Sequence, residues 1–259
     1  MKIAIVTHKD KCFLNNSIFY PVQVNAEKNN YVIDENYFLD NVGDNISIKN
    51  ENYCELTALY FMWKNIKNED VLGLNHYRRY FHFLNYSLFK PHRIIEIDSS
   101  DKLIEKHNQN ADKIKDRVRT WLQKNDVILP FVRKTKHNKK YISISDEYKT
   151  NHIASDWNVT MKIIQEKYPE YSNSISKYLD NNNEIYLMNI FIAKSEWVNK
   201  YCEWLFSILF EVEKNISISD DNYQKRVFGF LSERLLTLYV KHNNYKAKEL
   251  PLLFVKNLF

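Results

Sequence analysis

The block Asn75-His76-Tyr77-Arg78-Arg79 brings an amide, an imidazole, a phenol and two guanidiniums together directly after the apolar run Val71–Leu74. A run of this length and apolarity predicts a fully buried strand. In open α/β sheets, ligands bind at the carboxyl ends of such strands. Because arginine keeps its charge and its planar fork matches phosphate or carboxylate, the block predicts a site for an anionic ligand. The alternative interpretation is a solvated basic turn.

A second buried strand with a polar end is predicted at the start of the chain. The short apolar run Lys2–Val6 is followed by the polar residues Thr7–Asp10. The end of this strand is a second candidate ligand edge, and the alternative is an ordinary polar turn.

Glycine is scarce, and this restricts how a nucleotide could bind. The chain has three glycines, Gly43, Gly73 and Gly229, so neither a G-x-G-x-x-G fingerprint nor a Walker loop can be written. A bound nucleotide must therefore be held by side chains and by ordinary loop amides.

The elements that position these residues follow from hydrophobic periodicity, from caps and from turn residues. Strands are predicted over Phe19–Val24, Arg93–Asp98, Asp126–Pro130 and Glu184–Ala193. Helices are predicted from Asn50 or Asn52 to Lys67, and over Ala111–Lys124, Asp156–Lys167, Ser195–Asn215 and Tyr223–His242. Expected caps are an Asn52–Glu55 capping box, Asp156 and Ser195. Strands alternating with helices, and a helical last third, predict an α/β fold.

Composition narrows the class of protein. With 259 residues, of which 44% are hydrophobic, the chain can hold one large α/β domain or two small ones. The net charge of +5 is spread among interleaved acids and bases, so nucleic acid is a disfavoured partner. No run of about 18 apolar residues and no signal peptide occur, which predicts a cytoplasmic protein. The three cysteines, Cys12, Cys54 and Cys202, show no C-x-x-C spacing and are interpreted as reduced packing residues.

The basic run Arg133–Lys140 is the most cationic stretch of the sequence. Such a run is usually a solvated loop. Over an anionic site it could also act as a lid, or contact a lipid headgroup.

Several acids are candidates for proton transfer or for metal binding. Glu96 and Asp98 form an acid-x-acid pair, for which outward-facing acids on an edge strand are the favoured alternative. Asp156 lies near a histidine and could act as a base, although a helix cap explains it better. Glu233 follows Arg226 by seven residues, so both lie on nearly one helical face. Asn189 is the polar residue of an apolar strand, and it serves either a ligand or neighbouring backbone.

Four segments together resemble the DUF4422 family over essentially the whole chain. They are Gly43–Ser47, Tyr53–Tyr60 with Trp63–Asn65, Gly73–Phe81, and Arg226–Leu236. Asn75 and Ile190 depart from the family pattern. Members resemble glycosyltransferases of bacterial capsule, O-antigen and exopolysaccharide clusters, and some are associated with galactofuranosyl transfer from UDP-galactofuranose. The resemblance implies a single GT-A-like domain over residues 1–259, with a mostly parallel central sheet flanked by helices.

The resemblance also implies a UDP-sugar donor and a glycan acceptor, which could be linked to polyprenyl diphosphate at the inner face of the cytoplasmic membrane. Many GT-A enzymes hold the donor diphosphate through a metal on an Asp-x-Asp motif, and the sequence contains no Asp-x-Asp. We therefore expect no cofactor, with cations replacing Mn²⁺ or Mg²⁺, although neither metal is excluded. The expected donor-binding residues are Thr7, His8, Asp44, Asn45, His76, Tyr77, Arg78 and Arg79. Glu233 is the expected catalytic base with Asp156 second, and Asn189, Arg226 and Arg234 are expected to bind the acceptor.

Two other classes of function compete with the transferase. A non-catalytic module could bind an anionic sugar or a nucleotide sugar through the arginine pair. An RNA-binding protein could use the run Arg133–Lys140, and it would show a steep salt dependence of affinity.

Overall fold

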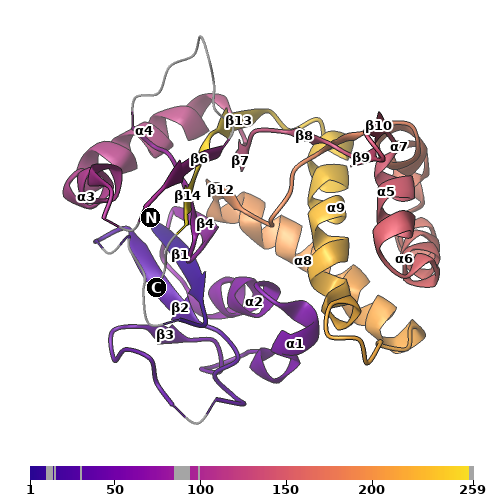
Figure 1. Ribbon diagram of the computed structural model, residues 1–259, viewed down its shortest axis with the longest axis horizontal. Helices are drawn as coiled ribbons and strands as arrows, with labels where there is room; N and C mark the ends of the chain where they lie inside the picture. The colour runs from indigo at the N-terminus through magenta and orange to yellow at the C-terminus, as the bar shows by residue number, and fades with distance from the viewer. Residues whose placement is uncertain (10–13, 15, 30, 85–93, 99, 257–259) are drawn as a thin grey trace.

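The computed structural model describes the chain apart from residues 10–13, 15, 30, 85–93, 99 and 257–259, and its centre is a mostly parallel sheet (Figure 1). Asp10, Cys12 and Arg93 of the sequence analysis lie outside the described residues. In the described part, the order of the main sheet is β13-β7-β12-β4-β1-β2-β3, and β5, β6 and β14 extend it. The strands are β1 (Lys2–Thr7), β2 (Phe19–Gln23), β3 (Phe38–Leu39), β4 (Val71–His76), β5 (Arg79–Phe81), β6 (Ile94–Ile97), β7 (Val127–Pro130), β8 (Arg133–Lys134), β9 (Lys136–His137), β10 (Lys140–Tyr141), β11 (Glu184–Ile185), β12 (Phe191–Lys194), β13 (Ala247–Leu250) and β14 (Leu252–Val255).

Helices cover both faces of the sheet. They are α1 (Asn50–Tyr53), α2 (Leu56–Asn65), α3 (Lys102–Gln109), α4 (Ala111–Lys124), α5 (Ile144–Asn151), α6 (Ala154–Lys167), α7 (Ser172–Ile175), α8 (Ser195–Asn215) and α9 (Val227–His242). Short turns of other helix types, η1 (Ser47–Lys49), η2 (Pro169–Tyr171), η3 (Ser176–Asp180) and η4 (Gln224–Arg226), join some of them. No helix in the described ranges is long and apolar enough to cross a membrane.

Alternation along the strands divides the core into two layers, because successive side chains of a strand point to opposite faces. In β1, Ile3 and Ile5 pack with the apolar faces of α3 and α4. Ala4 and Val6 pack on the other side, with residues of α2, α8 and α9. Figure 1 shows α3 and α4 on one side of the strands and α2 and α8 on the other.

The predicted strand Glu184–Ala193 is wrong as a single strand, because it is divided into β11 and β12. Met188 and Asn189 between them have φ values of 76° and 51°, in the left-handed region. This conformation turns the chain, so it is incompatible with a continuous ladder. The residues of this segment are apolar because they are buried, and not because they form one continuous strand.

The predicted caps of two helices are also wrong. The helix over Ala154–Lys167 begins before Asp156, and its N-cap is Ile153, so Asp156 lies in the first turn. The N-cap of α8 is Lys194, and the hydroxyl of Ser195 donates to the carbonyl of Glu69 instead of capping the helix. In both places the residue that the local sequence offered as a cap does not cap the helix, so the cap motif did not predict where the helix begins.

The predicted helix from Asn50 or Asn52 to Lys67 is broken into two pieces, α1 and α2. The break lies at Cys54, which has a φ of 51°. The amide of Asn50 donates to the Cys54 carbonyl at 2.8 Å, and the amide of Asn52 donates to the Lys225 carbonyl at 2.9 Å. The expected capping box between Asn52 and Glu55 is therefore absent, and the break leaves Glu55 at the start of α2.

Gly73 lets β12 approach β4, and we expect Gly73→Ala to lower the free energy of unfolding by about 1–3 kcal/mol. A Cβ at this position would lie 2.7 Å from Cγ1 of Ile192 and 3.1 Å from the Phe191 carbonyl oxygen. Urea unfolding measures the change. Gly229→Ala is the matched control, because its Cβ would lie 3.3 Å from the Cys54 side chain and alanine favours a helix interior. Equal losses in both variants would contradict this account of Gly73.

Candidate active site

A cavity of about 580 Å³ lies at the carboxyl ends of β1, β2 and β4. Because these strands are parallel neighbours, their ends meet at one edge of the sheet. The short helix α1 and the first turns of α9 close the opposite wall, and Figure 1 shows these two helices close together. The lining residues are Val6, His8, Val24, Asn50, Glu51, Cys54, Glu55, His76, Tyr77, Arg79, Met188, Asn222, Lys225, Arg226 and Glu233.

Two guanidiniums give one part of this cavity a positive charge. Arg79 begins β5, and Arg226 is the residue before α9, where its Nε donates to the Sγ of Cys54 at 3.3 Å. Burial and the neighbouring Arg78 lower the pKa of Arg79, but a guanidinium remains charged at physiological pH. A guanidinium pair in a cavity suits a diphosphate, because each can form two parallel hydrogen bonds with phosphate oxygens.

Glu233 is a carboxylate with the proton affinity of a catalytic base. Its Oε1 accepts the backbone N–H of Met188 at 2.8 Å, and its Oε2 lies 3.0 Å from Nη1 of Arg234. Burial raises the pKa of Glu233 to about 7, and the charge of Glu55 adds to the rise, whereas Arg234 opposes it. A base is most effective when its pKa is near the working pH.

Glu55 is a second carboxylate of the same cavity, and the sequence analysis assigned it to a cap. Its Oε1 accepts the Nδ2–H of Asn189 at 2.5 Å. Burial raises the pKa of Glu55, while the bond from Asn189 and the charges of Arg226 and Arg79 oppose the rise. The break at Cys54 that exposes Glu55 to the cavity is set by contacts with distant segments, so the local sequence carried no signal for this role.

Three aromatic or imidazole side chains complete the cavity near the strand ends. The ring of Tyr77 meets the ring of His8 edge-on, with centroids 5.0 Å apart. The Nε2 of His76 is buried and has no hydrogen-bond partner among the described residues. Burial lowers the pKa of His76 to about 3, with Arg79 adding to the shift, so this imidazole is neutral and can bind a ligand as donor or acceptor.

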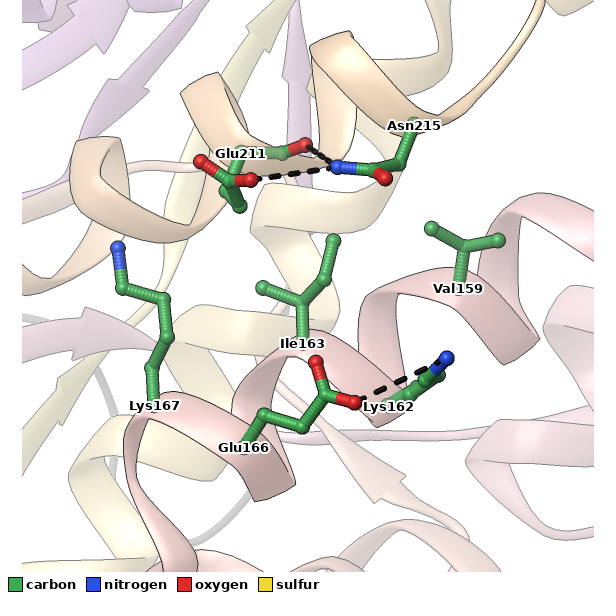
Figure 2. A pocket seen from close by; sticks show the side chains of 7 residues that line it. All are labelled: Val159, Lys162, Ile163, Glu166, Lys167, Glu211 and Asn215. Atoms are coloured by element: carbon green, nitrogen blue, oxygen red, sulfur yellow. Dashed lines mark hydrogen bonds and ion pairs between the residues drawn. The ribbon is translucent and has the colours of Figure 1, made fainter.

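A second cavity, of about 440 Å³, lies in the helical part between α6 and α8 (Figure 2). Figure 2 shows two pairs of polar side chains joined by dashed lines, Lys162 with Glu166 on α6 and Asn215 with Glu211 on α8. Lys162 lies 3.8 Å from Glu166, and Asn215 donates to Glu211. Because these groups satisfy each other and lie far from the strand ends, the candidate site is the cavity with Arg79 and Glu233.

Comparison with known proteins identifies the family. The family model described as a domain of unknown function, DUF4422, matches residues 2–244. The chain belongs to the DUF4422 family. No curated protein matches it. A solved structure described as the apo form of the bifunctional glycosyltransferase WbbM is similar to it, with a TM-score of 0.87 and 32% identity. The match covers 99% of this chain and 45% of that one.

The structure of this DUF4422 protein confirms the predicted α/β class with a mostly parallel sheet. Three of the four segments that carried the resemblance supply residues to the cavity. Tyr53–Tyr60 supplies Cys54 and Glu55, Gly73–Phe81 supplies His76, Tyr77 and Arg79, and Arg226–Leu236 supplies Arg226 and Glu233. The segment Gly43–Ser47 lies outside the cavity lining.

Several of the expected donor-binding residues of the DUF4422 chain lie elsewhere. Arg78 donates through Nε to the Val255 carbonyl at 3.2 Å and packs on the ring of Phe254, so it holds β14. Thr7 is fully buried and bonds to Lys9. Asp44 accepts from the Tyr60 hydroxyl, and the amide of Asn45 donates to the carbonyls of Asn41 and Gly43, so both shape their own loop.

The remaining expected residues do not line the cavity, although Arg234 and Asn189 contact its carboxylates. Asp156 is buried on α6, and burial raises its pKa. Arg234 is 3% exposed and bridges Glu233 and Glu147, with Nη2 2.7 Å from the latter. Asn189 contacts the site through its bond to Glu55. In the part of the chain that the structure describes, no group of three or more His, Cys, Asp or Glu side chains is placed to hold a metal ion.

Proposed function

We propose that this protein is a glycosyltransferase that moves a sugar, with galactofuranose as the candidate, from a UDP-sugar to a hydroxyl of a bacterial surface glycan. The observation that carries the proposal is one cavity that Arg79, Arg226 and the carboxylate of Glu233 line together. The similarity to WbbM, described as a bifunctional glycosyltransferase, supports the reaction class.

The proposed chemistry assigns a role to Glu233, to the two arginines and to Tyr77. Glu233 takes the proton of the acceptor hydroxyl while that oxygen attacks the anomeric carbon. The bond from the anomeric carbon to the diphosphate breaks, and UDP leaves with the electron pair. Arg79 and Arg226 neutralise the charge that develops on the leaving phosphate, so Arg226, which was expected to bind the acceptor, is proposed here to bind the donor. Tyr77 offers a ring on which the uracil or the sugar can stack.

Donor binding without a metal belongs to the same proposal. A metal held by an Asp-x-Asp motif does not fit the residues present, since the sequence lacks that motif and the described residues lack a ligand cluster. We expect UDP to bind with the same affinity in EDTA as in Mn²⁺, as measured by calorimetric titration. Binding that appears only with Mn²⁺ or Mg²⁺ would overturn the metal-free part, and an absence of UDP binding in all conditions would favour the non-catalytic module.

The acceptor side of the proposal includes a contact with the membrane. The acceptor is proposed to be a glycan on polyprenyl diphosphate at the inner face of the cytoplasmic membrane. Strands β9 and β10 form a hairpin whose turn, Asn138–Lys139, has φ values of 47° and 66°, typical of a tight type I′ turn. The hairpin and β8 carry four exposed lysines, of which Lys134 and Lys136 lie over the ring of Tyr141, which is 55% exposed. The four lysines are Lys134, Lys136, Lys139 and Lys140.

Replacing these four lysines with serine is expected to weaken binding to vesicles containing phosphatidylglycerol at least about tenfold, because each lysine near an anionic surface contributes about 1 kcal/mol. Co-sedimentation at 0.1 M salt measures the loss. A control with the same change in net charge replaces four exposed lysines of other surfaces, Lys106, Lys113, Lys124 and Lys162. Equal weakening by both sets would mean that total charge, rather than the hairpin, governs the contact.

A further inference from the structure

Arg234 is a buried cation that two glutamates share. Its Nη1 lies 3.0 Å from Oε2 of Glu233, and its Nη2 lies 2.7 Å from Oε2 of Glu147. Glu233 lines the candidate cavity, whereas Glu147 lies on α5, outside the cavity lining. The guanidinium therefore joins a carboxylate of the cavity to a carboxylate beyond its wall.

Further contacts fix the members of this bridge in place. The Nη1 of Arg234 also donates to the carbonyl of Phe230 at 2.9 Å, and its Cζ lies 5.4 Å from the centre of the Tyr148 ring. Glu147 is held in turn, because its Oε1 accepts the Nδ2–H of Asn151 at 2.8 Å. The Arg234 side chain is only 4% exposed, so water screens its charge weakly. The two carboxylates thus divide the charge of one guanidinium.

This division affects how strongly Glu233 holds a proton. An opposite charge close to a carboxylate lowers its pKa, and a like charge raises it. Burial raises the pKa of Glu233, Arg234 opposes the rise, and Glu147 adds to it. If Glu147 carried no charge, the charge of Arg234 would act on Glu233 alone. Glu233 would then be a weaker base.

Several other charged or titratable groups face Glu233, and the comparison below leaves them unchanged. They are Glu55 at the start of α2, Arg79 of β5, Cys54 at the helix break, Arg226 before α9, His8, His76 and Tyr77 at the strand ends, and the cavity residues Glu51 and Lys225. His152 also lies near Arg234 and Glu147. Burial and Arg234 lower the pKa of His152 to about 4, so this imidazole is neutral where Glu233 titrates.

We propose that Glu147 is a positioning residue outside the cavity that sets the basicity of Glu233 by binding one side of Arg234. This inference rests on the proposed role of Glu233 as the base, and it adds the part of the fold that tunes this base. Glu147 keeps Glu233 able to take the proton of the acceptor hydroxyl near neutral pH. The proton moves only from that hydroxyl to Glu233, and neither Glu147 nor Arg234 gains or loses one.

The test is Glu147→Gln, which keeps the shape of the side chain, can still accept from Arg234 and removes the negative charge. The pKa of Glu233 is measured from the NMR signal of its carboxyl carbon, which Glu233→Gln assigns. We expect this pKa to fall by at least about half a pH unit, because one cation then acts on one acid. The acidic limb of kcat/KM for UDP release should move to lower pH by the same amount, while UDP affinity stays within about twofold.

A second variant should shift the pKa of Glu233 in the opposite direction. Glu147→Gln combined with Arg234→Gln removes both charges of the bridge, so the change leaves no unpaired ion behind. Because Glu233 then lacks its cation, its pKa should lie above that of the wild type. Glu249→Gln is the matched control, since Glu249 accepts from the Tyr186 hydroxyl outside the cavity, and it should leave the pKa of Glu233 unchanged.

The possible results separate this inference from the proposed function. An unchanged pKa of Glu233 in folded Glu147→Gln would overturn the inference, and so would equal shifts in Glu147→Gln and Glu249→Gln. A double variant in which Glu233 titrates at or below the wild-type pKa would also overturn it. If the pKa of Glu233 shifts as expected but the profile of UDP release does not follow, the bridge is supported and the proposed role of Glu233 as the base is wrong.

Discussion

Glu233→Gln is expected to lower turnover by about 10²- to 10⁴-fold while leaving the affinity for UDP within about twofold of the wild type, because a general base contributes that much to rate and little to ground-state binding. Glutamine keeps the shape of Glu233 and can still accept the N–H of Met188. The measurement is UDP release from UDP-sugars with water as the acceptor, together with calorimetric titration of UDP. Full activity in the variant would remove Glu233 from the mechanism.

The pH profile gives this prediction a second readout. Glu233 must be ionised to accept a proton, and its pKa is raised to about 7, so kcat/KM of the wild type should rise as the pH increases through about 7. The raised pKa also means that protonation favours the folded state. This contribution to stability is complete below the unfolded pKa of about 4.5 and is lost as the pH rises through about 7. Glu233→Gln should therefore melt at a higher temperature than the wild type at pH 8.

Two outcomes separate the role of Glu233 from a general effect on the fold. Glu249→Gln, which alters a glutamate outside the cavity, should keep the acidic limb of the wild-type profile. A Glu233→Gln protein that is inactive and also less stable at pH 8 would indicate structural damage and contradict the assignment.

Arg79→Ala is expected to weaken UDP binding by about 10- to 100-fold, because a hydrogen bond to a charged group contributes about 1.5–3 kcal/mol. Arg78→Ala is the matched control on the next residue. Its guanidinium bonds to the carbonyls of Val255 and Lys256, so its loss should lower stability but leave UDP affinity nearly unchanged. Calorimetric titration of UDP measures both variants. Loss of UDP binding in Arg78→Ala alone would reverse the assignment.

The sequence predicted the edge of the sheet at which the candidate cavity lies, and the reasons are physical. Val71–Leu74 and Lys2–Val6 are apolar enough to be buried on both faces, and parallel strands of this kind end at one edge. The cations after the first run predicted an anionic ligand at that edge. These features are local, so one strand and its following residues contain all the information.

The choice between Arg78 and Arg79 could not be predicted in this way. Adjacent residues of an extended chain point to opposite sides, and either could have faced the cavity. Contacts with β14 determine which of the two arginines faces the cavity. This strand lies about 175 residues further along the chain. Its Phe254 pairs with Arg79, and the carbonyl of its Val255 accepts a hydrogen bond from Arg78.

The second carboxylate was missed for a similar reason. Glu55 enters the cavity because the helix breaks at Cys54, and it is held by a residue 134 positions away. The turn at Met188 and Asn189 was not predicted because the residues on either side of it are apolar. Buried strands and buried turns both give an apolar run in the sequence, so the run alone does not distinguish them. Both features depend on tertiary partners, since the break contacts Lys225 and Arg226 and the turn contacts Glu55 and α9.

The family match ends at residue 244, yet two strands of the sheet follow it. A chain truncated there would lack β13 beside β7, and β14 beside β5 and β6, so three strands would have unpaired backbone groups. It would also lose the fully buried side chains of Leu250, Leu253 and Val255. Open strand edges next to uncovered apolar surface promote self-association, so we expect such a fragment to aggregate. A boundary drawn from family similarity alone therefore falls short of the folding unit, which extends at least through Val255.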